Sequence, residues 1–468
     1  MLKPIILAGG VGSRLWPASR SNNPKQFQNI LDDNSMLHST INRINEFDYE
    51  RLTIVTNEEY RFYADKDAFK FDKDYEIILE PFGRNTAPAV AITAIKEITE
   101  KNNDPILLIM PSDHTIQDVK LFQKTITESM DIAESGKLVV FGVEPKSPNP
   151  NYGYIIPSNN KCNLGYCVEK FIEKPSINLA AKLISDNNAL FNSGMFMFKA
   201  SSFLNELKKY NSKMYEICTK VSKNLTRDNK FLRINPEIFE KCPDDSIDYA
   251  VMEKTSKGVV IKLESFWSDL GTWESIADIM NRDENNNCLN ADVYLKNSKN
   301  NFIKSDKFVV GLGIEDTFLI DTHDSILLSK RDHLDKLKDV VRDLKLNNRK
   351  EISNNFKDFR PWGWFENIFE DQDYKVKRLC IYKNSRISLQ KHFKRSEHWV
   401  VVSGIATITK GEDVFELNQG ESVYIELGEI HRIENKHSED CIIVETQIGV
   451  CIEEDIERLE DDFNRLES

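Results

Sequence analysis

Long apolar runs, paired cysteines and an excess of basic residues are all missing from this sequence of 468 residues. No apolar run approaches the ~20 residues that cross a bilayer. The N-terminus also lacks the basic region and cleavage site of a signal peptide. The 8 cysteines include no C-x-x-C pair, which favours free thiols in a reducing cytoplasm. A net charge of -13 argues against a nucleic-acid surface. We therefore expect a cytoplasmic protein that binds neither a membrane nor nucleic acid.

The first part of the chain alternates between strand-like and helix-like patterns. Four short apolar runs are typical of buried strands: residues 4–8, 51–56, 105–110 and 137–143. Between them, residues 35–44 and 86–98 carry apolar side chains at helical spacing, and Ser35 and Thr86 are candidate N-caps. This alternation predicts an α/β domain whose parallel sheet is covered by helices on both faces. In such sheets, ligands bind beyond the carboxyl ends of the strands.

The pattern changes twice further along the chain. Residues 285–350 are rich in Asn, Asp and short β-like pieces, which predicts a small β linker region followed by a helix over 333–347. From 351 to 468, period-two strands separated by turns predict an antiparallel, all-β domain. We therefore expect a first domain over 1–284, a linker region and a C-terminal domain.

The end of the sequence indicates one more helix. Apolar residues recur there at spacings of four and three, as on one face of an amphipathic helix: Ile452, Ile456, Leu459, Phe463 and Leu466. We expect this stripe to pack on its own chain; the alternative is the seam of a homodimer.

A glycine-rich turn, GGVGSR, follows the first apolar run and contains Gly9, Gly10 and Gly12. It is not a Walker A loop, because no GK[ST] follows, and the third glycine of a dinucleotide fingerprint is missing too. Glycines after a strand let backbone amides approach a phosphate group. Because Arg14 and Lys25 follow on the same connection, the pattern favours a triphosphate as the ligand.

Two carboxylates are candidate ligands of Mg²⁺. Asp113 follows the run 105–110 and supplies a hard oxygen ligand; the alternative is that it caps the next helix. Asp269, in the segment SDLGTW, is a second candidate, with an ordinary turn as its alternative. Since carboxyl ends of parallel strands meet at one edge, we expect Arg14, Lys25 and Asp113 to share a crevice.

Four of the 8 histidines lie in the C-terminal domain. Gln390 and His392 are two residues apart, so they share a face if the segment is a strand. Together with Glu397 and His431 they form a mixed N/O set suited to Zn²⁺ or another divalent ion. Arg395 lies beside these residues in the sequence and is a candidate for holding a phosphate or a developing oxyanion; the alternative is a surface strand residue.

Eight stretches between residues 3 and 280 resemble the sugar-1-phosphate nucleotidyltransferases, most closely the mannose-1-phosphate guanylyltransferases. They are GGVGSRLWPASR, PKQF, EPFGRNTAPA, IMPSDH, NYGYI, FIEKP, FNSGMF and SDLGTW. The resemblance implies a Rossmann-like domain with a mixed sheet. It also implies transfer of GMP from GTP to mannose 1-phosphate, giving GDP-mannose and diphosphate.

The same resemblance assigns roles to individual residues. It implies that Arg14 and Lys25 are catalytic and that Asp113 and Asp269 hold Mg²⁺. The implied nucleotide-binding residues are Gly9, Gly10, Gly12, Arg84 and Asn85. The implied sugar-phosphate-binding residues are Gly153, Glu173, Lys174 and Asn192.

The C-terminal segments RPWGWFE, SLQKHFKRSEHWVVVSGIA and HRIEN resemble the C-terminal domain of type II phosphomannose isomerases. This resemblance implies a cupin (jelly-roll) fold that interconverts mannose 6-phosphate and fructose 6-phosphate. The spacing of Gln390, His392, Glu397 and His431 matches the cupin metal-binding motifs, with Gln390 in place of the usual first histidine. A separate mutase would then connect the two activities.

Two alternatives remain open at this point. In the first, the chain is a transferase whose cupin domain is only structural or regulatory, and convergence of the four candidate metal ligands distinguishes the two cases. In the second, the chain senses a nucleotide sugar without turning it over. The intact set of Lys25, Asp113 and Asp269 argues against a sensor, because binding alone does not need both metal carboxylates.

Overall fold

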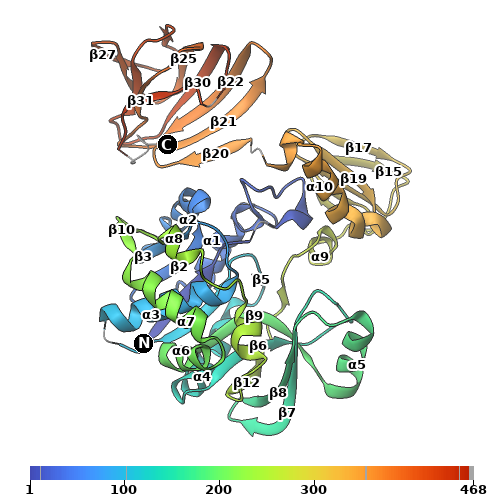
Figure 1. Cartoon of the computed structure of the whole chain (residues 1–468). Helices are drawn as coiled ribbons and strands as arrows, with labels where there is room; N and C mark the ends of the chain where they lie inside the picture. The colour runs from blue at the N-terminus through green and yellow to red at the C-terminus, as the bar shows by residue number, and fades with distance from the viewer. Residues whose placement is uncertain (11, 102, 354–355, 453, 463–468) are drawn as a thin grey trace. The chain divides into compact units, whose positions relative to one another are not determined.

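Residues 1–10, 12–101, 103–353, 356–452 and 454–462 are described by a computed structural model of the chain (Figure 1). The chain divides into two units, Met1–Ser353 and Asn354–Ser468, which we call unit 1 and unit 2. No helix among the described residues is both long enough and apolar enough to span a membrane.

An eleven-stranded mixed sheet forms the centre of unit 1, in the order β10-β11-β3-β2-β1-β4-β9-β6-β12-β8-β7. The strands are β1 (Leu2–Leu7), β2 (Leu52–Asn57), β3 (Tyr75–Glu80), β4 (Ile106–Pro111), β6 (Leu138–Val143), β7 (Tyr154–Cys162), β8 (Gly165–Ile172), β9 (Leu190–Lys199), β10 (Thr226–Asp228), β11 (Phe231–Arg233) and β12 (Gly258–Lys262). The four strands predicted from apolar runs are confirmed as β1, β2, β4 and β6. The mixed sheet implied by the resemblance is confirmed. The parallel sheet predicted from the strand–helix alternation alone was incomplete, because β9 lies between β4 and β6 and runs antiparallel to both.

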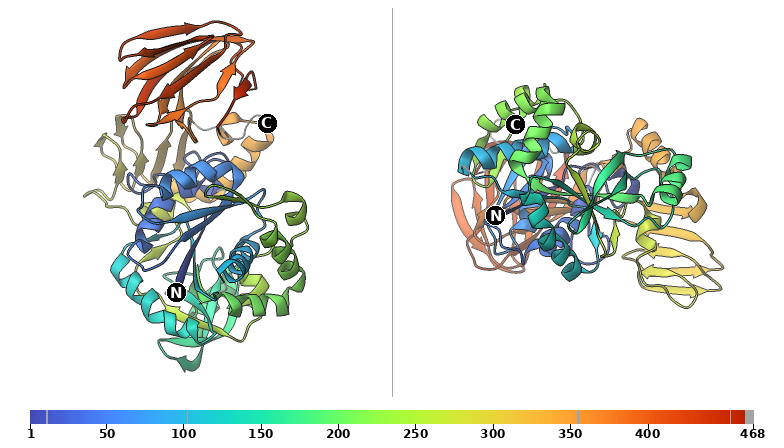
Figure 2. Two further views of the ribbon diagram at one scale, coloured as in Figure 1. Left: turned by 90° about the vertical axis from the view of Figure 1, so that its left-hand side faces the viewer. Right: turned by 90° about the horizontal axis from the view of Figure 1, so that it is seen from below.

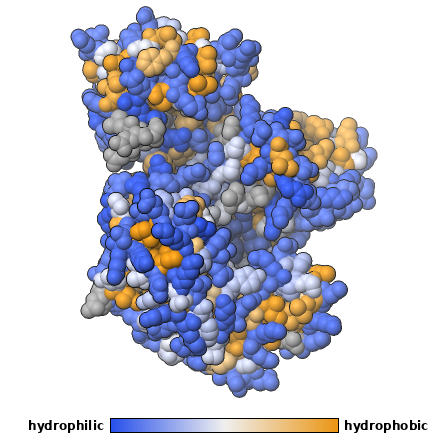
Figure 3. Space-filling model, in the orientation of Figure 1, coloured by the Kyte–Doolittle hydropathy of each residue, from blue (hydrophilic) through white to orange (hydrophobic). Residues whose placement is uncertain are grey.

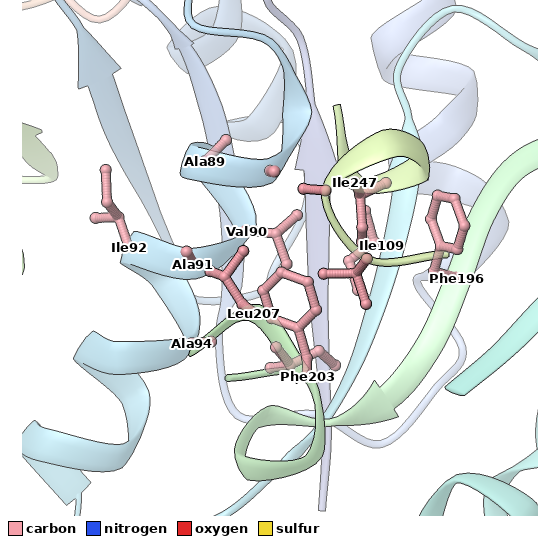
Figure 4. Packing of buried hydrophobic residues seen from close by; sticks show 14 of the residues in the cluster. Ala89, Val90, Ala91, Ile92, Ala94, Ile109, Phe196, Phe203, Leu207 and Ile247 are labelled. Atoms are coloured by element: carbon pink, nitrogen blue, oxygen red, sulfur yellow. The ribbon is translucent and has the colours of Figure 1, made fainter. Parts of the chain in front are cut away.

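Helices cover both faces of this sheet (Figure 2). The helices of unit 1 are α1 (Met36–Ile44), α2 (Arg61–Ala68), α3 (Thr86–Lys101), α4 (Val119–Glu134), α5 (Ile177–Asn187), α6 (Ala200–Tyr210), α7 (Ser212–Lys223), α8 (Pro236–Phe239), α9 (Trp273–Ala277) and α10 (Leu337–Leu346). On one face, alanines of α3 let its backbone approach the sheet closely, and Phe203 and Leu207 of α6 fill the space beside Ile109 and Phe196 (Figure 4).

The two predicted helix caps have different outcomes. Ser35 caps α1 as expected, since its side chain accepts a hydrogen bond from the His38 N–H at 3.0 Å. Thr86 is instead the first residue of α3, and its N–H donates to Asn85 Oδ1 at 3.0 Å. The prediction was therefore one residue too late.

Residues 288–321 wind into short coils that pair in parallel, and residues 326–330 pair antiparallel with the last of them. The strands are β14 (Cys288–Asn290), β15 (Val293–Lys296), β16 (Phe302–Lys304), β17 (Val309–Leu312), β18 (Thr317–Asp321) and β19 (Ile326–Lys330). Parallel pairing joins β14, β16 and β18 in one sheet and β15 and β17 in another. Successive coils are tied by Asn301, which donates to Asn287 Oδ1 through its backbone N–H and its side-chain amide. One outer face of these coils exposes Tyr294, Val310 and Leu312, and Figure 3 shows an orange area over this part of the molecule.

These coils share a hydrophobic core with the first part of unit 1. Trp16 and Trp273 pack together with Phe302, Phe318 and Leu337. The indole N–H of Trp273 donates to the Trp16 carbonyl at 3.0 Å, and its ring lies 5.8 Å from that of Phe302. The region predicted to be a linker therefore packs as part of unit 1. The helix expected over 333–347 is α10, with a 3-10 turn before it.

Unit 2 is an antiparallel β-sandwich, as expected for a jelly roll. Its two sheets have the orders β20-β21-β22-β30-β25-β28 and β27-β26-β29-β24-β31, with β23 paired to β29. The strands are β20 (Lys357–Arg360), β21 (Gly363–Glu370), β22 (Tyr374–Ile381), β23 (Ser385–Arg386), β24 (Leu389–Lys391), β25 (Arg395–Ser403), β26 (Ala406–Lys410), β27 (Asp413–Leu417), β28 (Ser422–Ile425), β29 (His431–Asn435), β30 (Cys441–Gly449) and β31 (Glu457–Glu460). Inward-facing residues of both sheets, including Trp399, Ile408 and Ile443, form the core.

The prediction of an amphipathic helix in the tail was wrong. Residues 457–460 form β31, which pairs antiparallel with β24, while Ile452 and Leu459 are 41% and 38% exposed. An open sheet edge offers unpaired backbone groups, and pairing with it outweighed the local helical pattern. Phe463 and Leu466 lie outside the described residues. The stripe therefore gives no support for a dimer seam.

The shared core predicts how fragments of unit 1 behave. A fragment of residues 1–353 is expected to unfold cooperatively on heating. A fragment of residues 1–284 lacks the coil side chains that cover Trp16 and Trp273, and burying each large apolar side chain contributes about 1.5–3 kcal/mol. Its melting temperature, followed by circular dichroism, should be lower by roughly 10 °C. Equal melting temperatures would show that the coils contribute nothing to the fold.

Candidate functional site

A cavity of about 450 Å³ lies beyond the carboxyl ends of the central strands of unit 1. Eight residues that the sequence singled out line it: Gly9, Gly10, Asn85, Asp113, Gly153, Glu173, Asn192 and Asp269. The lining residues succeed one another along the cavity in the order of the strands in the sheet, β3-β2-β1-β4-β9. Glu80 ends β3 and Asn85 follows it, the glycine loop follows β1, Asp113 follows β4, and Asn192 belongs to β9.

The glycine loop is shaped by contacts with the segment PKQF. Gly12 has φ +64, and a Cβ there would lie 2.6 Å from Lys25 Cβ, so only glycine fits this approach. The side-chain amide of Gln26 donates to the carbonyls of Ala8 and Gly10 at 2.9 and 2.8 Å. Gln26 was visible in the sequence only as the third letter of PKQF, and its partners are backbone atoms.

Lys25 joins two segments that are distant in the sequence. Its buried ammonium donates to Asp113 Oδ2 at 2.8 Å and also to the Asp269 carbonyl. Burial is the largest influence on the pKa of Asp113 and raises it, but attraction to Lys25 and His114 and the hydrogen bonds to the carboxylate together outweigh burial and hold the pKa below its usual range. The carboxylate is therefore charged, as a metal ligand must be.

Asp269 is brought near Asp113 by a two-stranded sheet. Ser268 of β13 (Trp267–Ser268) pairs with Thr115 of β5 (Thr115–Ile116). The Tyr152 hydroxyl donates to Asp269 Oδ1 at 2.6 Å. Asp113 and Asp269 thus present carboxylate oxygens to one cavity, which fits a hard divalent cation such as Mg²⁺.

At the β9 end, Gly153 permits a close approach of Glu173. A Cβ at position 153 would lie 2.2 Å from Glu173 Oε2, an oxygen that has no hydrogen-bond partner among the described residues. The Asn192 amide donates to Asp248 Oδ1 at 2.8 Å. Burial, followed by repulsion from Glu173, raises the pKa of Asp248 to about 7. These groups can accept hydrogen bonds from hydroxyl groups.

Two carboxyl groups of the cavity were missed from the sequence. Glu80 ends β3, and its Oε1 is buried without a hydrogen-bond partner among the described residues; burial is the main cause that raises its pKa to about 8. Asp248 starts a π-helical turn, a feature that often marks functional sites. Glu80 was visible only as the first letter of EPFGRNTAPA. Asp248 had no sequence signal.

Five expected site residues of unit 1 are not among the residues that line the cavity. One of them, Lys25, contacts the lining residue Asp113. Arg14 is exposed. Gly12 contacts Lys25 and leaves room for it. Arg84 donates to the Glu240 carbonyl at 2.8 Å instead. The Lys174 ammonium lies 2.9 Å from a Glu173 carboxylate oxygen and is 58% exposed, so it stands at the rim.

In unit 2, three of the expected metal ligands converge. His392, Glu397 and His431 offer ligand atoms that all lie within 4.8 Å of one another, and all three side chains are buried. The Gln390 side-chain nitrogen lies 3.4 Å from His392 Nε2. In sheet register, Gln390 of β24 is opposite His431 of β29.

Both histidines are arranged as metal ligands. The Nδ1 of His431 lies 2.8 Å from the Glu429 carbonyl, and the Nδ1 of His392 contacts the Asp455 carbonyl. A proton on Nδ1 leaves the Nε2 lone pair facing the cluster. Burial lowers the pKa of His392 to about 4 and also lowers that of His431, so both rings are neutral. The Nε2 of His431 has no hydrogen-bond partner among the described residues, which fits a site for a cation.

A second carboxylate holds Glu397 in place. The Trp399 indole N–H lies between Glu397 Oε2 and Glu445 Oε1, at 3.2 and 3.1 Å. The Gln447 amide likewise lies between Glu397 Oε1 and Glu445 Oε2, at 3.2 and 2.9 Å. Arg395 is buried rather than on the surface, and its Nε donates to Glu397 Oε1 at 3.1 Å.

Two family models match the chain: Nucleotidyl transferase over residues 3–286 and Mannose-6-phosphate isomerase C-terminal over residues 347–461. Among similar proteins, the xanthan biosynthesis protein XanB of Xanthomonas campestris is 40% identical over 467 residues, 99% of each chain. The mannose-1-phosphate guanylyltransferase of Salmonella muenchen is 40% identical over 470 residues, 100% of this chain and 99% of its own.

Two solved structures are similar to parts of the chain. The Thermus thermophilus structure described as a mannose-1-phosphate geranyltransferase has a TM-score of 0.66 and 25% identity, covering 74% of this chain and 99% of its own. The mannose-6-phosphate isomerase of Helicobacter pylori has a TM-score of 0.51 and 31% identity, covering 57% of this chain and 99% of its own.

Fold, cavity and family matches together define a nucleotidyl transferase with an isomerase-type cupin domain at its C-terminal end. The relatives of matching length specify this class further. The chain belongs to the family of mannose-1-phosphate guanylyltransferases that carry a mannose-6-phosphate isomerase C-terminal domain.

The contact between Gly12 and Lys25 predicts the effect of a methyl group. Gly12→Ala is expected to displace Lys25 and lower nucleotidyl transfer roughly a hundredfold, the size typical for losing one charge-stabilising group. Diphosphate release by the purified variant measures this. Gly136→Ala is the matched control, because φ is +86 there and the nearest atom to a Cβ is Ser202 Oγ at 3.6 Å. It should lose stability but keep its turnover; normal turnover in both variants would contradict the role of Gly12.

Proposed function

We propose that unit 1 transfers GMP from GTP to α-D-mannose 1-phosphate, and that its cavity binds the parts of the two substrates in the order of the strands. The observation that carries this proposal is the succession Glu80, glycine loop, Asp113 and Asn192 along one cavity. A base would lie near β3, the phosphates over β1 and β4, and the sugar near β9.

Glu80 is the group that would recognise the base. Guanine presents two adjacent donors, N1–H and its 2-amino group, which match the two oxygens of one carboxylate. Glu80 has an unpartnered buried oxygen and lies beside Gly9, whose added Cβ would be 3.8 Å from Glu80 Oε2. A base that supplies donors would favour the ionised carboxylate over the protonated one.

The transfer step needs positioning and charge neutralisation. A phosphate oxygen of mannose 1-phosphate attacks the α-phosphorus of GTP, the bond to the β-phosphate breaks, and diphosphate leaves. Lys25 supplies a fixed positive charge, because Asp113 and the Asp269 carbonyl hold its ammonium. Asp113 and Asp269 would hold Mg²⁺, which neutralises charge on the phosphates. Arg14 would act on the triphosphate from the exposed side of the loop.

Glu173, Asn192 and Asp248 would bind the mannose hydroxyl groups, and Lys174 at the rim would meet the sugar phosphate. The Glu173 oxygen beside Gly153 lacks a partner among the described residues, as expected for a group that waits for a ligand hydroxyl. The eight cysteines are all free thiols, which is consistent with our proposal of a cytoplasmic location.

The first experiment tests both the reaction and the choice of base. Purified protein with GTP, mannose 1-phosphate and Mg²⁺ is expected to release diphosphate and GDP-mannose. Glu80→Gln should lower kcat/KM for GTP by about tenfold to a hundredfold, the equivalent of ~1.5–3 kcal/mol for a hydrogen bond to a charged group. Because inosine lacks the 2-amino group, the preference for GTP over ITP should shrink in the variant. An unchanged preference would remove Glu80 from base recognition.

Unit 2 is proposed to interconvert mannose 6-phosphate and fructose 6-phosphate, which moves a proton between C1 and C2. His392, Glu397 and His431, with Gln390 beside them, would hold Zn²⁺ or another divalent ion. A bound ion would supply Lewis-acid polarisation of the sugar carbonyl. Arg395 would orient the anionic oxygen from its buried place beside Glu397. The alternative, a purely structural cupin domain, predicts that unit 2 does not interconvert the two sugar phosphates.

A second experiment tests the metal site. Removing the metal with a chelator, or replacing His431 with Ala, is expected to abolish fructose 6-phosphate formation, and His431→Ala should also lose bound metal in elemental analysis. His398→Ala is the matched control, since His398 is a neighbour of Glu397 that packs against Tyr424 outside the cluster. Isomerase activity that survives metal removal would refute this mechanism. Guanylyl transfer should persist in His431→Ala when Mg²⁺ is present.

A further inference from the structure

A second cavity of unit 1, of about 740 Å³, is lined by an unusual concentration of basic side chains. Six of its lining residues are cationic, and no lining residue is acidic: the cations are Arg20, Lys338, Arg342, Lys345, Arg349 and Lys350. This contrasts with the net charge of -13 of the whole chain. The cavity is separate from the transferase cavity, with which it shares no lining residue.

The basic rim follows from the spacing of residues on α10. Lys338, Arg342 and Lys345 lie four and three positions apart, so they occupy one face of the helix, with Val341 beneath them. The floor of the cavity is apolar, formed by Val341, Ile352 and Trp16. The Trp16 indole N–H donates to the Glu351 carbonyl at 3.1 Å, which fixes this wall.

Two lysines of the rim, Lys338 and Lys345, differ from the arginines in their partners. Arg342 lies 3.1 Å from Asp339, and Arg349 lies 2.7 Å from Glu351. In contrast, Lys338 and Lys345 form no ion pair or hydrogen bond with any described residue. Their charges face the same cavity, and a bound anion would offset their mutual repulsion.

We propose that this cavity is a second, noncatalytic binding site for a small organic phosphate. Phosphate oxygens would contact Lys338, Arg342 and Lys345, and an apolar or aromatic body would lie against Trp16 and Ile352. The volume is within the range of about 300–1,000 Å³ that is usual for small-molecule sites. The negative charge of the rest of the chain disfavours a long polyanion such as nucleic acid.

An occupant would contact the connection that carries the catalytic lysine. Ser19 lines this cavity, and its hydroxyl donates to the Gly12 carbonyl. Arg20 also lines it and exchanges backbone hydrogen bonds of 3.1 Å with Asn23, two residues before Lys25. The site therefore lies against the back of the loop that forms the phosphate end of the transferase cavity. The proposal itself does not depend on the transferase reaction.

Calorimetric titration of the full chain with tripolyphosphate, and separately with GTP, tests the proposal. The wild type is expected to bind two equivalents of each, and the second equivalent should be lost in K338E/K345E. The matched control K220E/K223E makes the same change in charge on exposed positions of α7 and should keep both equivalents. Equal melting temperatures of the variants show that the fold is intact.

The two probes distinguish the parts of the site. Tighter binding of GTP than of tripolyphosphate at the second site would support the contribution of the apolar floor, and equal binding would assign recognition to the phosphates. A single equivalent of tripolyphosphate in the wild type that K338E/K345E retains would overturn the proposal. Two equivalents retained by K338E/K345E would overturn it as well, because the second ion would then bind elsewhere.

Discussion

The buried ammonium of Lys25 is the constraint on which the geometry of unit 1 depends. An unpaired charge in that position costs several kcal/mol, so the fold must supply oxygen partners. It does so from two distant segments, through the Asp113 carboxylate and the Asp269 carbonyl. The glycine connection, the end of β4 and the segment after β13 must therefore assemble together. Gly12 allows this by leaving room for Lys25, and Gln26 fixes the loop through the carbonyls of Ala8 and Gly10. The arrangement of charges beside the cavity thus results from satisfying one buried cation.

The opposite condition holds for several other polar groups. Among the buried side-chain atoms without a hydrogen-bond partner in the described part of the chain are those of Glu80, Glu173 and His431. Leaving such an atom unpaired costs about 1–3 kcal/mol. The cost is understandable where a ligand completes the hydrogen bonding, and all three atoms lie at the two proposed sites. The base, the sugar and the metal would each supply one missing partner.

Local patterns in the sequence were sufficient for much of this fold. The runs that became β1, β2, β4 and β6 are continuous and apolar, because their strands are buried on both faces. The insertion of β9 between β4 and β6 is a long-range pairing, which alternation along the chain cannot reveal. In the tail, residues 457–460 pair with the edge of β24 and form a strand, although their apolar residues have helical spacing. At the site, motif residues such as Asp113 and Asn192 do line the cavity. Glu80 and Asp248 were missed because their importance comes from burial, and burial depends on which strands become neighbours.

The two proposed sites differ in their electrostatics. In unit 1 the proposed ligand is highly charged, and the site offers a fixed cation and carboxylates suited to a metal that shields phosphate. In unit 2 the cluster is suited to a cation, and the neutral histidines and one carboxylate give it few charges of its own. Orientation there comes from hydrogen bonds: carbonyl groups fix Nδ1 of both rings, and Trp399 and Gln447 each bridge Glu397 to Glu445. Since both oxygens of Glu397 are held from behind, the carboxylate cannot rotate without breaking two bridges. The rigidity of the metal cluster therefore depends on Glu445, a residue that contributes no ligand atom to it.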